Sequence, residues 1–439
     1  MSQEPRMSLP TGRKRPRPRY VLLDNPVLRA LCLSMAIMNI GYAIIIPVLP
    51  VYSDRYHTPA AVLGLMFTGF ALGRALVQVA GGALVGRWGD RLVGTLAVGL
   101  IALPTLCLAF AVHPAALLAS RVVWGTLEGL AIPAIYSLVA RCEKVERQGE
   151  AMGAFGASAV AGMALGPVVG AYALMAGGIA LTFSIGAAVH LAAAAMLFHA
   201  ARPQALRPAP QAPGEAATVG RGWGDETPGA IQSSPPRAWW RPAAWAAAAE
   251  GLGAAVALGC VDLANNLAYG MVEPVLPLQL SRLGYSPRDV SLVFTLGLAV
   301  FAVGSLGLGR LCDRAHPVRL LGGTLAAAAC AVATLSLAQA LWTVFLVFGG
   351  FMVTQCLIYI LARKLVREMY SEERARARAF GLFGTLSDLG FIVGPAVGSL
   401  TFSAAREGVF WAFGAAMLPF LAAVWAAGRL YRERRGLRR

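Results

Sequence analysis

The chain has 439 residues, of which 57% are hydrophobic and only 14% are charged, and its mean hydropathy is +0.62. This composition lies well outside the range of soluble globular domains and indicates a membrane protein. Of its 38 lysines and arginines, 32 lie in the N-terminal stretch, in the loops after every second predicted span and in the C-terminal stretch. The formal net charge of +16 therefore reports membrane topology and contact with the lipid bilayer, and we expect no nucleic-acid partner.

Twelve apolar runs recur along the chain, each long enough to cross about 30 Å of hydrocarbon as a helix. The runs are continuous rather than alternating, which favours helices over the strands of a membrane barrel. They are centred approximately on residues 27–53, 60–86, 92–112, 115–140, 151–175, 178–200, 252–280, 288–309, 318–338, 341–362, 379–403 and 408–428. The distribution of basic residues predicts a multi-pass protein of the cell (inner) membrane with both termini in the cytoplasm.

The runs fall into two sets of six, separated by a stretch rich in proline, glycine and alanine that predicts a flexible linker. The expected organisation is a basic cytoplasmic N-terminus (1–26), a six-helix bundle (27–200), a cytoplasmic linker (201–251), a second six-helix bundle (252–428) and a basic cytoplasmic C-terminus (429–439). The predicted fold class is therefore an all-α membrane protein of twelve transmembrane helices in two pseudo-symmetric bundles. A monomer is expected.

The first and seventh runs carry the same pattern, because NIGYAIIIPVLP (39–50) matches NLAYGMVEPVLP (266–277) at an offset of 227 residues. The shared polar residues are Asn39 with Asn266 and Tyr42 with Tyr269. Thr58-Pro59 and Ser286-Pro287 follow in the same register, and each pair predicts a hydroxyl N-cap followed by proline at the first helical position. Two parallel repeats of this kind are typical of a transporter with a substrate site at their interface.

A charged hexapeptide ends the second and the eighth run, as GRWGDR (86–91) and GRLCDR (309–314). Its glycines are expected to permit close helix approach, and its aspartates to lie near the start of the following helix. We predict a pair of cytoplasmic gates that are closed while the outer side is open. The gate residues are Gly86, Asp90, Arg91, Gly309, Asp313 and Arg314.

A second repeated motif joins FGASAVAGMALGPVVG (155–170) to FGTLSDLGFIVGPAVG (383–398). Glycines at four-residue steps predict a bare helix stripe against which another helix packs, and a proline in each copy permits a bend. These residues are Gly162, Gly166, Pro167 and Gly170 in the first copy, and Gly390, Gly394, Pro395 and Gly398 in the second.

Six ionisable residues stand out inside predicted spans, where an unpaired charge is costly, so each is a functional candidate. They are Arg74, Arg121, Glu128, Asp262, Glu273 and Asp388. An ion pair that serves assembly alone is the alternative for each of them. In the seventh run, Asp262, Asn266, Tyr269 and Glu273 share one helix face, and the repeat positions of the two acids hold Met35 and Ile46. This asymmetry favours a chemical role for the acids, which can take up and release a proton.

With these motifs the chain resembles the major facilitator superfamily, and in particular its twelve-span drug:H⁺ antiporters. The resemblance is carried by the hexapeptide at 86–91, by GMALGPVVGA (162–171) and by RVVWGTLEG (121–129), which begins with a membrane-embedded arginine. It implies that Arg121 takes part in proton coupling. Glu128 is expected either to contact substrate or to serve as a structural partner of Arg74 or Arg121.

Three features are similar to those of vesicular monoamine transporters. They are GRALVQ (73–78), the Glu273-Pro274 pair of the seventh run, and Asp388, which precedes the Gly-Pro of the eleventh run. This similarity implies that Arg74 pairs with Asp388 and that Glu273 recognises a proton or an amine. Met38 and Thr354 stand where those transporters carry acids, which argues against a monoamine as the substrate.

The sequence thus predicts a proton-coupled secondary transporter that works by alternating access, an efflux antiporter for a small lipophilic cation or zwitterion. The predicted proton-coupling residues are Glu273, Asp388, Arg74, Arg121 and Asp262. The predicted substrate-binding residues are Asn39, Tyr42, Glu128, Asn266, Tyr269 and Glu273. One alternative is an anionic metabolite bound by the two arginines, and another is a receptor or scaffold that does not transport.

Neither an enzyme nor a cofactor is expected, and the proton gradient would supply the energy for transport. The predicted spans hold neither a nucleophile with its base nor a metal cluster, the seven cysteines include no Cys-x-x-Cys pair, and His190 has no ligands at suitable spacing.

Overall fold

The computed structural model describes residues 21–111, 113–143, 147–202, 252–370, 373–405 and 408–434. Most of the predicted N-terminal stretch (1–20), nearly all of the predicted linker (203–251) and the last five residues of the chain (435–439) lie outside the described residues.

Helices make up all the regular structure of the described residues. The first half consists of α1 (Val21–Asp24), α2 (Pro26–Ala43), the 3-10 turn η1 (Ile46–Val48), α3 (Leu49–Tyr56), α4 (Ala60–Trp88), α5 (Asp90–Leu100), α6 (Ala102–Phe110), α7 (Pro114–Arg141) and α8 (Gln148–Ala200). The second half consists of α11 (Gly253–Arg282), α12 (Pro287–Gly307), α13 (Gly309–Arg314), α14 (Pro317–Thr334), α15 (Leu341–Met369), α16 (Glu373–Ala405), α17 (Val409–Met417), η5 (Leu418–Phe420) and α18 (Leu421–Arg434).

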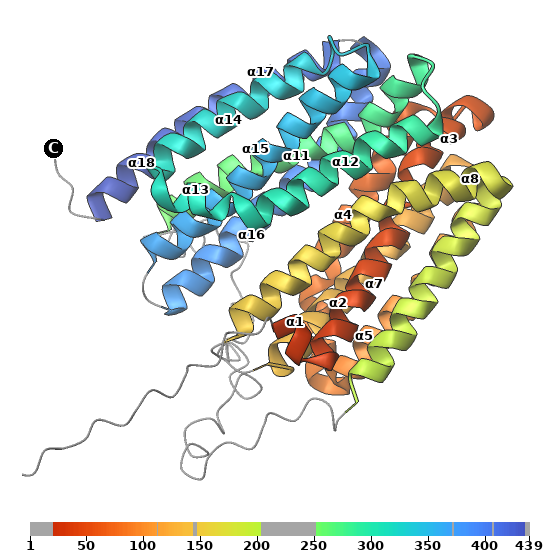
Figure 1. Cartoon of the computed structure of the whole chain (residues 1–439), viewed down its shortest axis with the longest axis horizontal. Helices are drawn as coiled ribbons and strands as arrows, with labels where there is room; N and C mark the ends of the chain where they lie inside the picture. The colour runs from red at the N-terminus through yellow and green to blue at the C-terminus, as the bar shows by residue number, and fades with distance from the viewer. Residues whose placement is uncertain are drawn as a thin grey trace, which may run out of the picture.

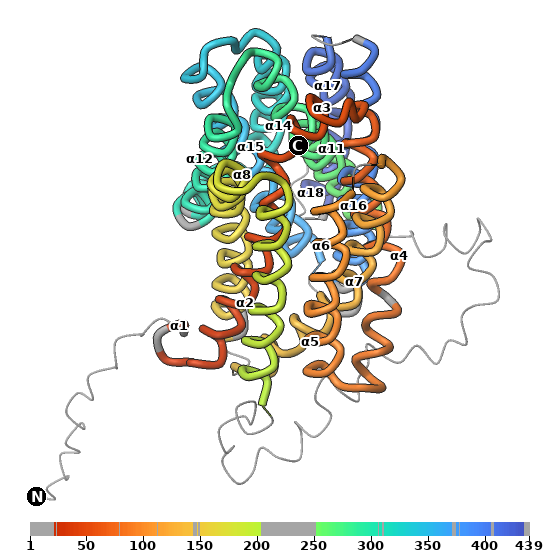
Figure 2. Tube along the Cα trace, turned by 90° about the vertical axis from the view of Figure 1, so that its right-hand side faces the viewer, coloured from red at the N-terminus to blue at the C-terminus, as the bar shows by residue number. Residues whose placement is uncertain are grey.

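The two halves form two helix bundles that lie side by side, coloured red to yellow-green and green to blue in Figure 1. Figure 2 shows the helices running roughly along one common direction, with α1 and α5 at one end and α3 and α17 at the other. We call the end that carries residues 86–91 and 309–314 the hexapeptide end, and the other the opposite end. Large hydrophobic residues remain exposed on the outer faces, as expected of a lipid-facing surface; examples are Leu76, Leu103, Val303 and Leu346.

The twelve-span prediction is confirmed once α8 is divided. Eleven stretches of the described residues are long and apolar enough to cross a membrane, and one of them covers 51 residues, Glu150–Ala200. The backbone within it is non-helical at Gly177 and Gly178, and Gly178 has φ of 69°, a left-handed value that glycine adopts without strain. The chain therefore turns back there, between the predicted fifth and sixth spans.

The helix-start predictions are right at one repeat position and wrong at the other. Ser286 caps α12 in a capping box with Asp289, as expected. Thr58 does not cap α4, which begins at Ala60 after Pro59. The N-cap position of α4 is held by Pro59, and Thr58 belongs to the end of α3, where its N–H donates to the carbonyl of Tyr52 at 3.1 Å. Its buried hydroxyl has no hydrogen-bond partner among the described residues.

The glycine stripes lie against neighbouring helices. A Cβ atom added at Gly162 or Gly166 would meet the backbone of α2, and one added at Gly390 would lie 2.5 Å from the carbonyl oxygen of Leu263 on α11. Gly170, Gly394 and Gly398 are equally close to the first or seventh span. Pro167 and Pro395 lie within α8 and α16. The stripes thus allow α2 to pack tightly on α8 and α11 on α16.

Candidate functional site

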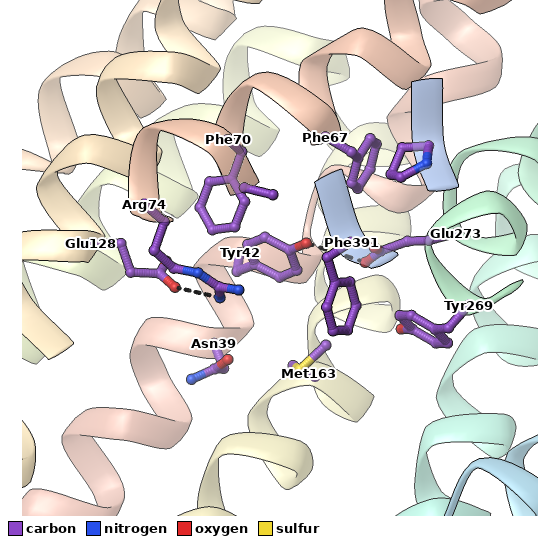
Figure 3. Close-up of a pocket in the computed structure, with 12 residues that line it drawn as sticks. Asn39, Tyr42, Phe67, Phe70, Arg74, Glu128, Met163, Tyr269, Glu273 and Phe391 are labelled. Carbon is purple, nitrogen blue, oxygen red and sulfur yellow. Dashed lines mark hydrogen bonds and ion pairs between the residues drawn. The ribbon is translucent and has the colours of Figure 1, made fainter. Parts of the chain in front are cut away.

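A cavity of about 170 Å³ lies between the halves, bounded by residues of α2, α4, α7 and α8 from the first half and of α11 and α16 from the second. Its lining residues are Asn39, Tyr42, Phe67, Phe70, Ala71, Arg74, Glu128, Met163, Tyr269, Glu273, Phe391 and Pro395. Aromatic rings therefore form much of the wall, and a few polar groups converge on the space (Figure 3). This composition is typical of small-molecule sites.

Glu273 provides a buried acid at the cavity and is 2% exposed. The hydroxyl of Tyr42, on the other half, donates to Glu273 Oε1 at 3.4 Å. Tyr269 is the repeat counterpart of Tyr42, yet its buried hydroxyl has no hydrogen-bond partner among the described residues. The two halves thus contribute unequally to the site, and Tyr269 retains an unused donor beside the cavity.

Arg74 lies between two carboxylates. Its Nη1 atom is 3.7 Å from Glu128 Oε1, and its Nη2 atom is 3.7 Å from Asp388 Oδ1. The first contact joins α4 to α7 within one half, whereas the second joins α4 to α16 across the two halves. In Figure 3 the ring of Tyr42 lies between the Arg74–Glu128 pair and Glu273. The arginine therefore links the acids of both halves around the cavity.

Arg121 is fully buried, and none of its three side-chain nitrogens has a hydrogen-bond partner in the part of the chain that the structure describes. Four aromatic rings surround its guanidinium, with their centres 4.8 to 5.4 Å from the Cζ atom: Tyr42, Phe67, Phe70 and Trp124. Their faces stabilise the cation. Because three of these rings also line the cavity, Arg121 lies behind its aromatic wall.

Five of the six predicted substrate-binding residues line the cavity, and Asn266 is the exception. Its side chain is turned towards α16, where it donates to the carbonyl and to the hydroxyl of Ser387 at 3.1 and 2.6 Å. Asp262 points to the same place, because Ser387 donates to its Oδ2 atom at 2.6 Å. Asn39 lines the cavity while it donates to the carbonyl of Met35 at 2.9 Å.

Each hexapeptide aspartate pairs with a basic residue of its own half. Asp90 Oδ2 is 2.6 Å from Arg141 Nη1, and Asp313 Oδ1 is 2.8 Å from Lys364 Nζ. Both partners lie 51 residues after their aspartate, so the two halves form corresponding ion pairs at equivalent positions of the repeat. Arg91 Nε donates to the carbonyl of Phe198 at 3.2 Å.

One expectation about the hexapeptides is wrong, and the other holds in the first copy only. A Cβ atom at Gly86 or Gly309 would meet nothing within 4 Å, so neither glycine serves a close helix approach in this arrangement. Asp90 is the first residue of α5, because Gly89, with φ of 83°, ends α4 directly before it. In the second copy all six residues form α13, which ends with the exposed Arg314, and α14 begins only at Pro317, so Asp313 precedes no helix directly.

Among the described residues, the polar contacts found between the halves lie near the middle of the molecule and towards the opposite end. Besides those of Tyr42 and Arg74, Thr68 Oγ1 donates to the carbonyl of Ile392 at 2.7 Å, and Ser281 Oγ donates to Asp54 at 3.1 Å. The halves are therefore joined at the opposite end.

The sequence reasoning missed several residues that shape the site. Gly125 and Gly129 bring α7 onto the backbone of α4 at Phe70 and Arg74, and their Gly-x-x-x-Gly spacing was a usable signal. Arg363, whose Nη2 is 3.5 Å from Asp262 Oδ2, lies one residue beyond the predicted tenth span (341–362). Among the described residues, no group of three or more His, Cys, Asp and Glu side chains is placed to hold a metal ion.

A family model described as "Major Facilitator Superfamily" matches residues 31–261 and 258–438. The chain is 29% identical over 150 residues to the quinolone resistance protein NorA of Staphylococcus aureus, which covers 34% of this chain and 38% of that protein. It is 27% identical over 156 residues to multidrug resistance protein 2 of Bacillus subtilis (strain 168), covering 35% and 38%. The matched segment thus spans little more than a third of either relative.

The fold is similar to crystal structures of a bacterial homolog of the human lysosomal transporter Spinster. The inward-facing, unoccupied conformation matches with a TM-score of 0.70 and 17% identity over 93% of this chain and 97% of that one. The inward-facing, occupied conformation matches with a TM-score of 0.67 and 18% identity over 93% and 96%.

Proposed function

The chain belongs to the major facilitator superfamily, and from this premise we propose that it is a proton-coupled efflux antiporter for a small lipophilic cation or zwitterion. One observation carries the proposal: the Glu273 carboxylate, 2% exposed, borders an aromatic cavity between the two halves. Aromatic faces attract cations, and a carboxylate shielded from bulk water binds a cation or a proton more readily than one at the surface. Substrate and proton are thus expected to compete for the same group.

Asp388 is proposed to couple that exchange to movement, with Arg74, because their contact joins α4 of one half to α16 of the other. A proton on Asp388 removes the charge that attracts the guanidinium and weakens this connection between the halves. Glu128 keeps Arg74 paired on its own half when that happens. The halves are then free to rock and to expose the cavity to the other side.

The arrangement described above is proposed to be the inward-facing one, since the halves are joined at the opposite end and most basic residues of the described part of the chain lie at the hexapeptide end. Asp90 and Asp313 are then ready to exchange their partners within each half for contacts between the halves. The printed names of the bacterial relatives, which refer to quinolone and multidrug resistance, support a drug-like substrate class.

An anionic substrate has less support. Arg74 already lies between two carboxylates, and Arg121 is separated from the cavity by aromatic rings. Neither arginine therefore offers an unshielded positive charge to a ligand in the cavity.

The test is proton flux in liposomes that contain the purified protein and a pH-sensitive dye. With a pH gradient imposed, tetraphenylphosphonium and the zwitterion norfloxacin are expected to trigger proton movement, and citrate is not. The double variant Glu273→Gln/Asp388→Asn should lose this response, whereas Glu433→Gln, at an exposed acid of α18, should keep it. Flux in the double variant equal to wild type, or none with any compound in the wild type, would refute the proposal.

A further inference from the structure

The charge pair Asp262–Arg363 is present in one repeat and absent from the other. Their repeat positions hold Met35 and Ala140, so both charges are missing from the first half together. The surrounding residues do match, since Ile135-Tyr136 aligns with Ile358-Tyr359 and the gate partner Arg141 with Lys364, all at an offset of 223. A pair needed only for the packing of six helices would be expected in both halves, so this one has a task specific to the second half.

Arg363 is held in place on α15 while part of its guanidinium stays accessible. Its Cζ atom lies 3.6 Å from the centre of the Tyr359 ring, and its Nη1 donates to the Tyr359 carbonyl at 3.1 Å. Its Nη2 is 3.5 Å from Asp262 Oδ2, and the side chain is 32% exposed. A guanidinium has five N–H donors, so these contacts leave donors free for another acceptor.

Asp388 is an acid on which the Arg363 guanidinium already acts electrostatically. Its chain neighbour, Ser387, donates to the same Oδ2 atom of Asp262 that Arg363 approaches. The charged groups that act on Asp388 come from three packed helices: Arg74 on α4, Asp262 on α11 and Arg363 on α15. Glu128 on α7 reaches it through Arg74. Two arginines thus act on this acid, Arg74 from the first half through a contact of 3.7 Å and Arg363 from its own half.

We propose that Arg363 is a positioning residue that receives the Asp388 carboxylate once the halves have separated, Arg74 is withdrawn and Asp388 has released its proton. An ionised Asp388 left without a cation in the membrane would oppose proton release and destabilise the separated state, and a partner within its own half removes that obstacle. Arg74 needs no new partner when it leaves Asp388, because Glu128 of the same half remains paired with it. The inference deepens the proposed transport cycle and rests on it for its purpose, although the ion-pair exchange itself is measurable without a substrate.

The test is a double-mutant cycle between residues 363 and 388, with the separation of the halves as the readout. Nitroxide labels at Phe110→Cys and Leu337→Cys, which are 74% and 65% exposed at the opposite end of each half, report that distance by electron–electron resonance. The background is the full chain with its seven native cysteines replaced.

Arg363→Gln should reduce the population with separated opposite ends by at least about fivefold. In the Asp388→Asn background the same substitution should have less than about a twofold effect, because a neutral side chain needs no cation. Arg363→Lys should restore part of the population, and Arg367→Gln, at an exposed arginine one turn further along α15, should leave it unchanged. An equal effect of Arg363→Gln in both backgrounds would mean that the arginine serves Asp262 alone, and would overturn the proposal.

Transport of tetraphenylphosphonium by the same variants separates this inference from the proposed function. Arg363→Gln should lower the maximal rate by at least about fivefold and leave the dissociation constant of the probe within about twofold of wild type. If the wild-type protein moves no probe, the proposed function fails, while the label distances still decide the role of Arg363. A raised dissociation constant with an unchanged maximal rate would instead place Arg363 in the binding site and overturn its positioning role.

Discussion

Gly129→Ala would test how closely α7 controls the position of Arg74. A methyl carbon at residue 129 would lie 2.5 Å from the carbonyl oxygen of Arg74 and 3.1 Å from its Cα atom, where ordinary contact begins at 3.4 Å. Both are backbone atoms that no rotamer change can move, so α4 must shift by about 1 Å relative to α7. Overpacking of this kind costs about 1 to 3 kcal/mol, against about 0.5 to 1 kcal/mol that alanine contributes to a helix.

The expected results are a lower midpoint of thermal unfolding in detergent and slower transport of tetraphenylphosphonium. Transport should suffer because both contacts of Arg74 are already 3.7 Å long, and a shift of α4 lengthens at least one of them. Gly156→Ala is the matched control, since a Cβ atom there meets nothing within 4 Å. Equal unfolding midpoints and equal transport rates for the two variants would refute the reasoning.

Three other outcomes are expected. Tyr42→Phe removes the hydrogen bond across the cavity and should lower transport of tetraphenylphosphonium about fivefold. Tyr269→Phe removes a hydroxyl that has no partner among the described residues and should lower it less, so equal rates for the two variants would contradict this. Asp90→Asn should slow transport at saturating probe while equilibrium binding of the probe stays near wild type, and a pure loss of affinity would exclude a gating role. Ser286→Ala should cost about 1 kcal/mol in thermal unfolding experiments through loss of a helix cap; Thr58→Ala loses no cap and serves as the control.

The sequence alone determined the helices, their number and the internal repeat. Hydropathy and periodicity are local properties, and a span of about 20 apolar residues has few alternatives in a bilayer. The ionisable residues inside the spans were evident for the same reason. Similarity to known transporters, rather than spacing, suggested that Arg74 and Asp388 lie together, and the structure has them 3.7 Å apart.

Only the tertiary structure decided which way each helix faces and what each polar group touches. The sequence places Asn266 and Glu273 on one face of α11, yet Asn266 is hydrogen-bonded to Ser387 whereas Glu273 borders the cavity. The reason is that a helix face of this length packs against more than one structural element. The enclosure of Arg121 by rings from three helices and the contact between Asp262 and Arg363, 101 positions apart, depend on packing between helices distant in the chain. No local pattern specifies such contacts, since helix rotation and interhelical distance are set by all the side chains at each interface.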